Sequence, residues 1–86
     1  MGNVQLQADF NERVRAVIVK TFALAPEDGH GELRMGAVPK WDSLGHMRLV
    51  VELEEEFGVT FATYTIAQLL DVESIARVIL NLQIEK

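Results

Sequence analysis

The 86-residue sequence contains no cysteine, which excludes disulfide bonds, thiol catalysis and cysteine-ligated metals. Basic residues are also few, since eight Lys and Arg stand against 13 Asp and Glu, for a net charge of −5. A nucleic-acid-binding surface needs clustered Lys and Arg, so this balance argues against nucleic acid as a partner. No apolar run reaches the length of a membrane span, and the N-terminus lacks the layout of a secretion signal. We therefore expect a cytoplasmic protein that does not insert into membranes.

Length and composition indicate a single globular domain. Hydrophobic residues make up 49% of the sequence and charged residues 24%, which is typical of a compact protein and too apolar for a disordered chain. A chain of 86 residues can bury one modest core but not two. We expect one domain over residues 1–86, with residues 1–8 as a flexible N-terminus, and a monomer in solution.

Hydrophobic periodicity predicts that the chain is all-α. A first helix is expected over about residues 9–24, since Asp9 and Glu12 have the spacing of a capping box and Pro26 disfavours helical geometry just before it. Its buried face would hold apolar residues at helical spacing: Phe10, Val14, Val17, Ile18 and Phe22. A long connection follows over residues 25–42, and part of it is expected to fold back over the helices: Leu33, Met35 and Val38.

Three further helices are predicted after this connection. The second should occupy residues 43–57 and end at Gly58, because glycine readily adopts the left-handed conformation that closes a helix. A short helix is expected over about residues 63–70. Asp71 should cap a last helix that runs through about Leu82, with a buried stripe formed by Ile75, Val78, Ile79 and Leu82. Three longer helices and one short one fit a small four-helix bundle.

The second predicted helix carries two apolar stripes. One has the spacing of a core face and holds Leu49, Val50, Leu53 and Phe57. The other is rotated away from it and holds Leu44, Met47 and Val51. One helix in so small a bundle rarely buries both, so either the long connection covers part of the second stripe or the stripe is a docking surface for a partner. Glutamates follow, and they form either a solvated face or a recognition element: Glu52, Glu54, Glu55 and Glu56.

The segment Trp41-Asp42-Ser43-Leu44 places a serine, preceded by a carboxylate, where the long connection ends and the second helix begins. Serine is a common helix N-cap, and Asp42 competes for the same role. The position also suits an attached phosphodiester, because the N–H groups and the dipole at a helix N-terminus favour a phosphate. Ser43 is therefore either a cap, an attachment point or both.

The pattern around Ser43 resembles the acyl carrier protein and peptidyl carrier protein family. The resemblance rests on Asp42-Ser43-Leu44, on Met47, Leu49 and Val50, and on the run Leu53-Glu54-Glu55-Glu56-Phe57-Gly58. It continues in Asp71-Val72-Glu73-Ser74-Ile75-Ala76, which is similar to the start of that family's last helix. The resemblance covers about residues 10–82.

This resemblance implies a carrier that catalyses nothing itself. It implies that a phosphopantetheinyl transferase moves 4′-phosphopantetheine from coenzyme A onto Ser43, with Asp42 assisting the modification. The thiol of the arm would hold acyl or related intermediates as thioesters. Acyl-loading and acyl-transferring enzymes would bind the family's docking positions, which correspond to Leu44, Met47, Arg48 and Val51.

Some residues depart from the usual pattern of the family. Gly45 stands where many fatty-acid-synthesis carriers have a carboxylate, and Arg48 stands where they commonly have glutamate. Trp41 occupies a position that is more often small, and residues 62–64 replace a stretch that is usually acidic. These differences predict a less negative docking face. We therefore expect a specialised carrier, in polyketide, nonribosomal-peptide or modified-lipid assembly.

Other functions compete with a carrier. A hydrolase could pair Ser43 with His46, but no oxyanion donor or Gly-x-Ser-x-Gly motif accompanies them, so His46 is expected to be a surface residue. A metal site centred on His30 is disfavoured by the spacing and number of its acidic neighbours: Glu27, Asp28 and Glu32. The stronger alternative is a helical interaction module that is never modified and that binds a partner through Leu44, Met47 and Val51.

Overall fold

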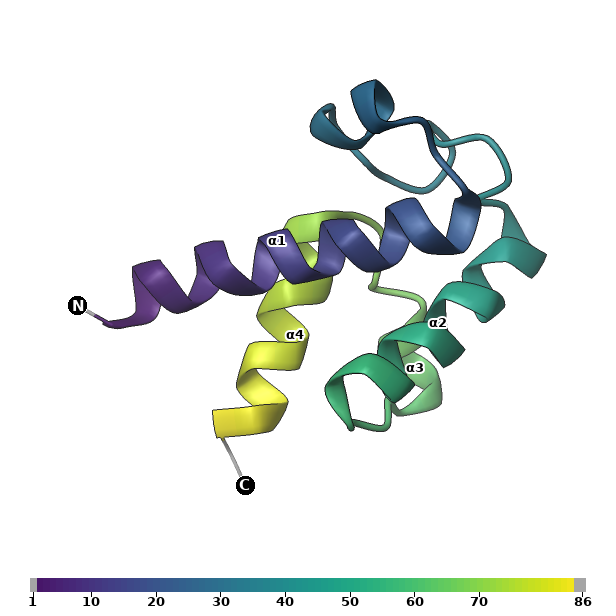
Figure 1. The fold of residues 1–86 in the computed structure, drawn as a ribbon. Helices are drawn as coiled ribbons and strands as arrows, with labels where there is room; N and C mark the ends of the chain where they lie inside the picture. The colour runs from purple at the N-terminus through teal and green to yellow at the C-terminus, as the bar shows by residue number, and fades with distance from the viewer. Residues whose placement is uncertain (1, 85–86) are drawn as a thin grey trace.

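Residues 2–84 are described by a computed structural model, in which four α-helices and one 3₁₀ helix follow one another (Figure 1). Their bounds are Gly2–Phe22 for α1, Pro26–His30 for the 3₁₀ helix η1, Ser43–Phe57 for α2, Thr63–Ile66 for α3 and Val72–Ile84 for α4. No strand forms within residues 2–84. The predicted all-α fold, a small bundle of three longer helices and one short one, is confirmed. None of these helices combines the length and the apolar character needed to cross a bilayer.

The helices are arranged around α1, which contacts both α2 and α4. In Figure 1, α4 crosses α1, and α2 and α3 lie together beside it. The long connection of residues 23–42 starts at the C-terminal end of α1 and ends at the N-terminal end of α2 (Figure 1). This path brings the connection next to the first turn of α2, where Ser43 lies.

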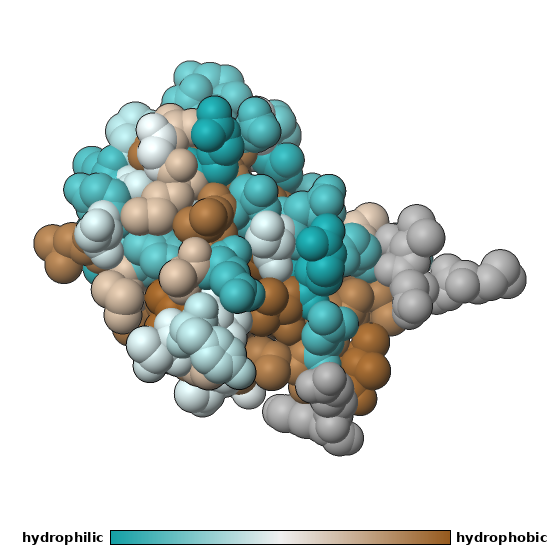
Figure 2. Space-filling model, turned by 180° about the vertical axis from the view of Figure 1, so that it is seen from behind, coloured by the Kyte–Doolittle hydropathy of each residue, from teal (hydrophilic) through white to brown (hydrophobic). Residues whose placement is uncertain are grey.

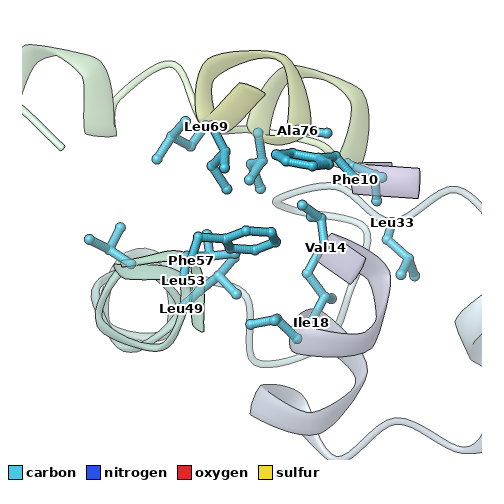
Figure 3. Packing of buried hydrophobic residues seen from close by; sticks show 14 of the residues in the cluster. Phe10, Val14, Ile18, Leu33, Leu49, Leu53, Phe57, Leu69 and Ala76 are labelled. Atoms are coloured by element: carbon cyan, nitrogen blue, oxygen red, sulfur yellow. The ribbon is translucent and has the colours of Figure 1, made fainter. Parts of the chain in front are cut away.

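Side chains from α1, α2 and α4 meet in one hydrophobic core (Figure 3). The predicted core face of α2 is confirmed as buried: Leu49, Val50, Leu53 and Phe57. The apolar residues predicted for the first helix are also buried: Phe10, Val14, Val17, Ile18 and Phe22. In α4, Ile75 and Ile79 are fully buried, whereas Val78 and Leu82 pack against the core with partial exposure. Each full burial of such a side chain contributes about 1.5–3 kcal/mol, so this core holds the helices together.

The long connection is an ordered part of this core. Leu33 and Val38 are buried and Met35 packs against the cluster, as predicted. The Met35 N–H donates a hydrogen bond to the Leu70 carbonyl over 2.9 Å, which ties the connection to the segment before α4. The connection also contains η1, whose start at Pro26 agrees with the preference of proline for the first turn of a helix.

The N-terminal boundary of α1 differs from the prediction. The helix begins at Gly2, so residues 2–8 are helical, and Asp9 lies inside the helix rather than at its cap. Side-chain hydrogen bonds at i,i+4 spacing support these early turns: Gln5 donates to Asp9 over 3.0 Å and Gln7 donates to Asn11 over 2.9 Å. The capping-box interpretation is therefore wrong, because local polar pairs extend the helix beyond the first core residue.

Two helix boundaries follow the sequence prediction closely. Gly58 closes α2 in the left-handed conformation (φ 66°), and its N–H donates to the Glu54 carbonyl. Asp71 caps α4, since its carboxylate accepts the Ser74 N–H over 2.8 Å. The hydrogen bonds from Ser74 hold the pKa of Asp71 below its usual value. This carboxylate therefore stabilises the fold at pH values above its usual pKa, and the contribution is lost as the pH falls through the lowered pKa.

Candidate functional site

Asp42 and Ser43 form the start of α2. Asp42 has extended backbone geometry, and its carboxylate accepts the Gly45 N–H over 2.8 Å. Of the two residues that competed for the N-cap, Asp42 takes the role. Ser43 is the first residue of the helix, its side chain is exposed, and its hydroxyl has no hydrogen-bond partner among residues 2–84. The helix start therefore holds a free hydroxyl on a rigid element.

This assignment of the cap can be tested by stability. Replacing Asp42 with alanine should lower the free energy of unfolding by about 1 kcal/mol, because the Gly45 N–H loses its acceptor. Replacing Ser43 with alanine should change the free energy of unfolding by less than about 0.5 kcal/mol, because the serine side chain is exposed and makes no hydrogen bond that the substitution would break. Urea denaturation of both variants measures the difference. The opposite order would show that the serine caps the helix.

Trp41, just before the cap, is fully buried rather than part of a surface. Its ring stacks on Phe22 of α1, with 5.7 Å between the ring centroids, and on His46, with 6.2 Å. The Trp41 indole N–H donates a hydrogen bond to His46 Nδ1 over 2.9 Å. Trp41 is thus the anchor that fixes the end of the long connection against α1 and α2.

His46 is buried, with 7% of its surface exposed, so the expectation of a surface residue is wrong. Because an indole N–H can only donate, His46 Nδ1 accepts and the neutral ring carries its proton on Nε2. Nε2 lies 2.9 Å from the carbonyl oxygen of Ile66, the last residue of α3, and donates to it in this tautomer. Both ring nitrogens are engaged, which leaves neither to accept a proton from Ser43.

Gly45 lies under the end of the long connection. A Cβ on Gly45 would overlap the Lys40 carbonyl oxygen and would come 3.0 Å from a ring carbon of Phe22. Lys40 itself adopts a left-handed backbone conformation (φ 76°), which turns the chain over the helix. Glycine at this place is therefore required by packing. Gly45 and Trp41 are both buried, so neither presents a side chain on the exposed face of α2.

An open, shallow depression of about 310 Å³ adjoins Ser43. It is lined by the end of the connection and the helix start: Met35, Gly36, Val38, Lys40, Trp41, Asp42 and Ser43. Lys40 is exposed there and brings a positive charge to the side of the serine. A phosphodiester on Ser43 would meet this charge and the N-terminal dipole of α2, so the residues present fit a phosphopantetheine group.

The second apolar stripe of α2 is exposed. Leu44 is 75% exposed, Met47 49% and Val51 50%, so the long connection does not cover them. Arg48 is exposed between them, and we name these four residues the α2 surface. Seen from behind, with α2 on the left, hydrophobic and hydrophilic surface alternate along that side of the molecule (Figure 2). The predicted partner-binding residues are thus exposed along the first turns of α2, starting next to Ser43.

The edge of the α2 surface toward α1 carries mixed charge. A shallow groove of about 330 Å³ lies there, lined by Lys20, Thr21, Arg48, Val51 and Glu52. Lys20 adds a positive charge that sequence periodicity did not assign to this site. Two of the four glutamates have structural contacts: Glu54 accepts the Phe61 N–H over 2.9 Å, and Glu56 lies 3.9 Å from Arg13. The acidic run is therefore partly a structural feature.

His30, the centre of the disfavoured metal site, lies at the end of η1. Across the described part of the chain, no group of three or more His, Asp or Glu side chains could hold a metal ion.

No protein-family model, curated protein or solved structure matches this chain. A functional assignment therefore depends on the geometry around Ser43 and on the sequence pattern.

Proposed function

We propose that this protein is an acyl carrier protein that holds acyl or related intermediates as thioesters on a 4′-phosphopantetheine arm attached to Ser43. The observation that carries the proposal is the exposed Ser43 hydroxyl in the first turn of α2, which Asp42 releases from capping. The exposed α2 surface beside it supplies a place for partner enzymes. The sequence resemblance to carrier proteins around both features supports the same assignment.

The proposed modification uses Ser43 as a nucleophile. Ser43 Oγ forms a bond to a phosphorus of coenzyme A, the pyrophosphate bond breaks, the adenosine bisphosphate part leaves, and the hydroxyl proton passes to a base of the transferase. Asp42 Oδ1 stays engaged with the Gly45 N–H, and its other carboxylate oxygen is free to assist the metal ion that the transferase uses. Lys40 and the start of α2 then stabilise the phosphodiester. When bound, the arm supplies the thiol that this cysteine-free chain lacks.

The partners that we propose are a phosphopantetheinyl transferase and acyl-loading and acyl-transferring enzymes. We place the protein in the cytoplasm as a monomer, with no nucleic-acid partner, in agreement with its net charge of −5. Arg48 makes the α2 surface less negative than the usual pattern, which favours a specialised pathway of polyketide, nonribosomal-peptide or modified-lipid assembly. Binding to a housekeeping ketosynthase as tight as to a pathway-specific enzyme would contradict this choice of pathway.

The carrier assignment is tested by incubating the protein with coenzyme A, magnesium and a broad-specificity phosphopantetheinyl transferase, and recording the intact mass. We expect a gain of one phosphopantetheine in the wild-type chain and none in Ser43→Ala. Absence of the gain with several active transferases would refute the carrier. The unmodified interaction module would then remain, because the exposed Leu44, Met47 and Val51 favour it independently of Ser43.

The α2 surface gives a separate kinetic prediction. Met47→Asp should raise the KM of the modified protein for an acyl-loading enzyme about tenfold, since a charge replaces an apolar contact at the centre of the interface. The value of kcat should change little, because Ser43 keeps its place. Ile84→Asp is the matched control: Ile84 is 60% exposed but lies at the end of α4. Equal KM values for both variants would exclude Met47 from docking.

A further inference from the structure

We infer that His46 is the positioning residue for Ser43: it joins Trp41 to α3 through two hydrogen bonds and thereby fixes the place from which the serine reacts. This inference rests on the proposed function, because it concerns the modification of the same serine. Trp41 stands two residues before Ser43 and His46 three residues after it. The hydrogen bond between their side chains closes a loop around the nucleophile.

Each member of this unit is fixed by contacts of its own. Trp41 is held by stacking on Phe22 and by its backbone N–H, which donates to the Val38 carbonyl over 3.1 Å. His46 is held by the helix, since its backbone N–H donates to the Asp42 carbonyl over 2.7 Å. Its ring then reaches the Ile66 carbonyl in α3. The segment that carries Ser43 is therefore tied to α1, to α2 and to α3 at the same time.

The bond between Trp41 and His46 resists opening because it is buried. A buried indole N–H or ring nitrogen that loses its partner is left without water to replace it, which is more costly than losing an exposed hydrogen bond. The intact bond restrains the chain before Ser43. A nucleophile displaced by about 1 Å can lose about a hundredfold in rate, so this restraint bears directly on the reaction.

The location of His46 separates positioning from docking. His46 lies on the buried side of α2 with Leu49 and Leu53, whereas Leu44, Met47 and Val51 are exposed on the other side. Removing the His46 ring should therefore leave the partner-binding surface in place. The expected signature is a fall in kcat for the modification of Ser43 with little change in KM, the reverse of the effect expected for Met47→Asp.

The experiment compares three variants of the full chain with coenzyme A and a broad-specificity transferase. His46→Leu removes both hydrogen bonds, and we expect kcat to fall about tenfold with KM within about twofold of wild type. His46→Gln keeps one acceptor and one donor in its amide, and we expect it to recover most of kcat. Ile79→Val is the control for stability, because Ile79 is fully buried in α4, away from Ser43.

A spectroscopic measurement accompanies the kinetics. In the wild-type chain, ¹⁵N shifts of the His46 ring should report the neutral form with the proton on Nε2, and the Trp41 indole proton should exchange slowly with solvent. In His46→Leu that proton should exchange much faster. An indole proton that exchanges equally fast in both chains would overturn the inference, because the hydrogen bond would then not hold Trp41.

The kinetic outcomes also decide the matter. A wild-type kcat in a folded His46→Leu variant would overturn the positioning role of His46 without contradicting the proposed function. A loss of kcat in Ile79→Val equal to that in His46→Leu would also overturn it. If no transferase modifies the wild-type chain while its indole proton is protected, the proposed function fails and the role of His46 in modification fails with it. Failure of the inference and failure of the proposed function therefore give different results.

Discussion

Replacing Trp41 with alanine should lower the free energy of unfolding by about 3–5 kcal/mol, the range for large aromatic residues removed from a core. Trp41 is 1% exposed and stacks on Phe22, so its removal leaves a cavity beside α1. It also leaves His46 Nδ1 without its donor in a buried place. Since small domains are stable by only about 5–15 kcal/mol, this single change should remove much of the total stability.

Urea denaturation followed by far-ultraviolet circular dichroism measures this loss. Tryptophan fluorescence cannot serve as the probe, because the variant lacks the only tryptophan of the chain. Tyr64→Ala is the matched control. Tyr64 is an aromatic residue of α3 that is 73% exposed, so its removal should cost less than about 0.5 kcal/mol. A loss below about 1 kcal/mol for Trp41→Ala would contradict the buried position of the indole ring.

Replacing Gly45 with alanine should destabilise the protein by about 1–3 kcal/mol, the usual cost of adding a methyl group to a filled space. The added Cβ would overlap the Lys40 carbonyl oxygen, which is a backbone atom and cannot turn aside as a flexible side chain would. The end of the long connection must therefore move, and the start of α2 with it. A carboxylate side chain would be larger still and should fit less well.

Gly31→Ala is the control for this prediction. Apart from Gly31 itself and its two chain neighbours, no atom lies within 4 Å of a Cβ built on this residue, and its φ of −81° suits any residue. Thermal unfolding of the two variants should show a lower midpoint for Gly45→Ala and almost no change for Gly31→Ala. An unchanged midpoint for Gly45→Ala would mean that the connection does not lie against the helix.

Periodicity was sufficient to predict the helices and most of the core. The spacing of Leu49, Val50, Leu53 and Phe57 identified the buried face of α2, and Gly58 and Asp71 identified two helix ends, because these features depend on residues close in sequence. The predicted start of α1 lies later than the observed start, because polar pairs such as Gln5 with Asp9 extend the helix without any apolar signal. For the second stripe the sequence leaves two alternatives open, and the structure shows that the long connection does not cover it.

The surroundings of Ser43 were harder to predict because they depend on how the long connection folds. His46 has the helical spacing of the core stripe with Leu49 and Leu53, and this spacing indicates a buried residue. The polarity of the histidine side chain favours an exposed position instead. The partner that makes its burial acceptable is the Trp41 indole N–H, which no local pattern reveals. The same holds for Gly45, whose close contact with Lys40 exists only in the folded chain.

We propose that Ser43 carries a phosphopantetheine arm in the cell. The most direct measurement is the mass of the peptide that contains residues 41–48, taken from protein purified out of the cells that make it naturally and without added transferase. We expect a peptide heavier by one phosphopantetheine, with the added mass on Ser43. An unmodified peptide, from cells whose other carrier proteins are modified, would contradict it.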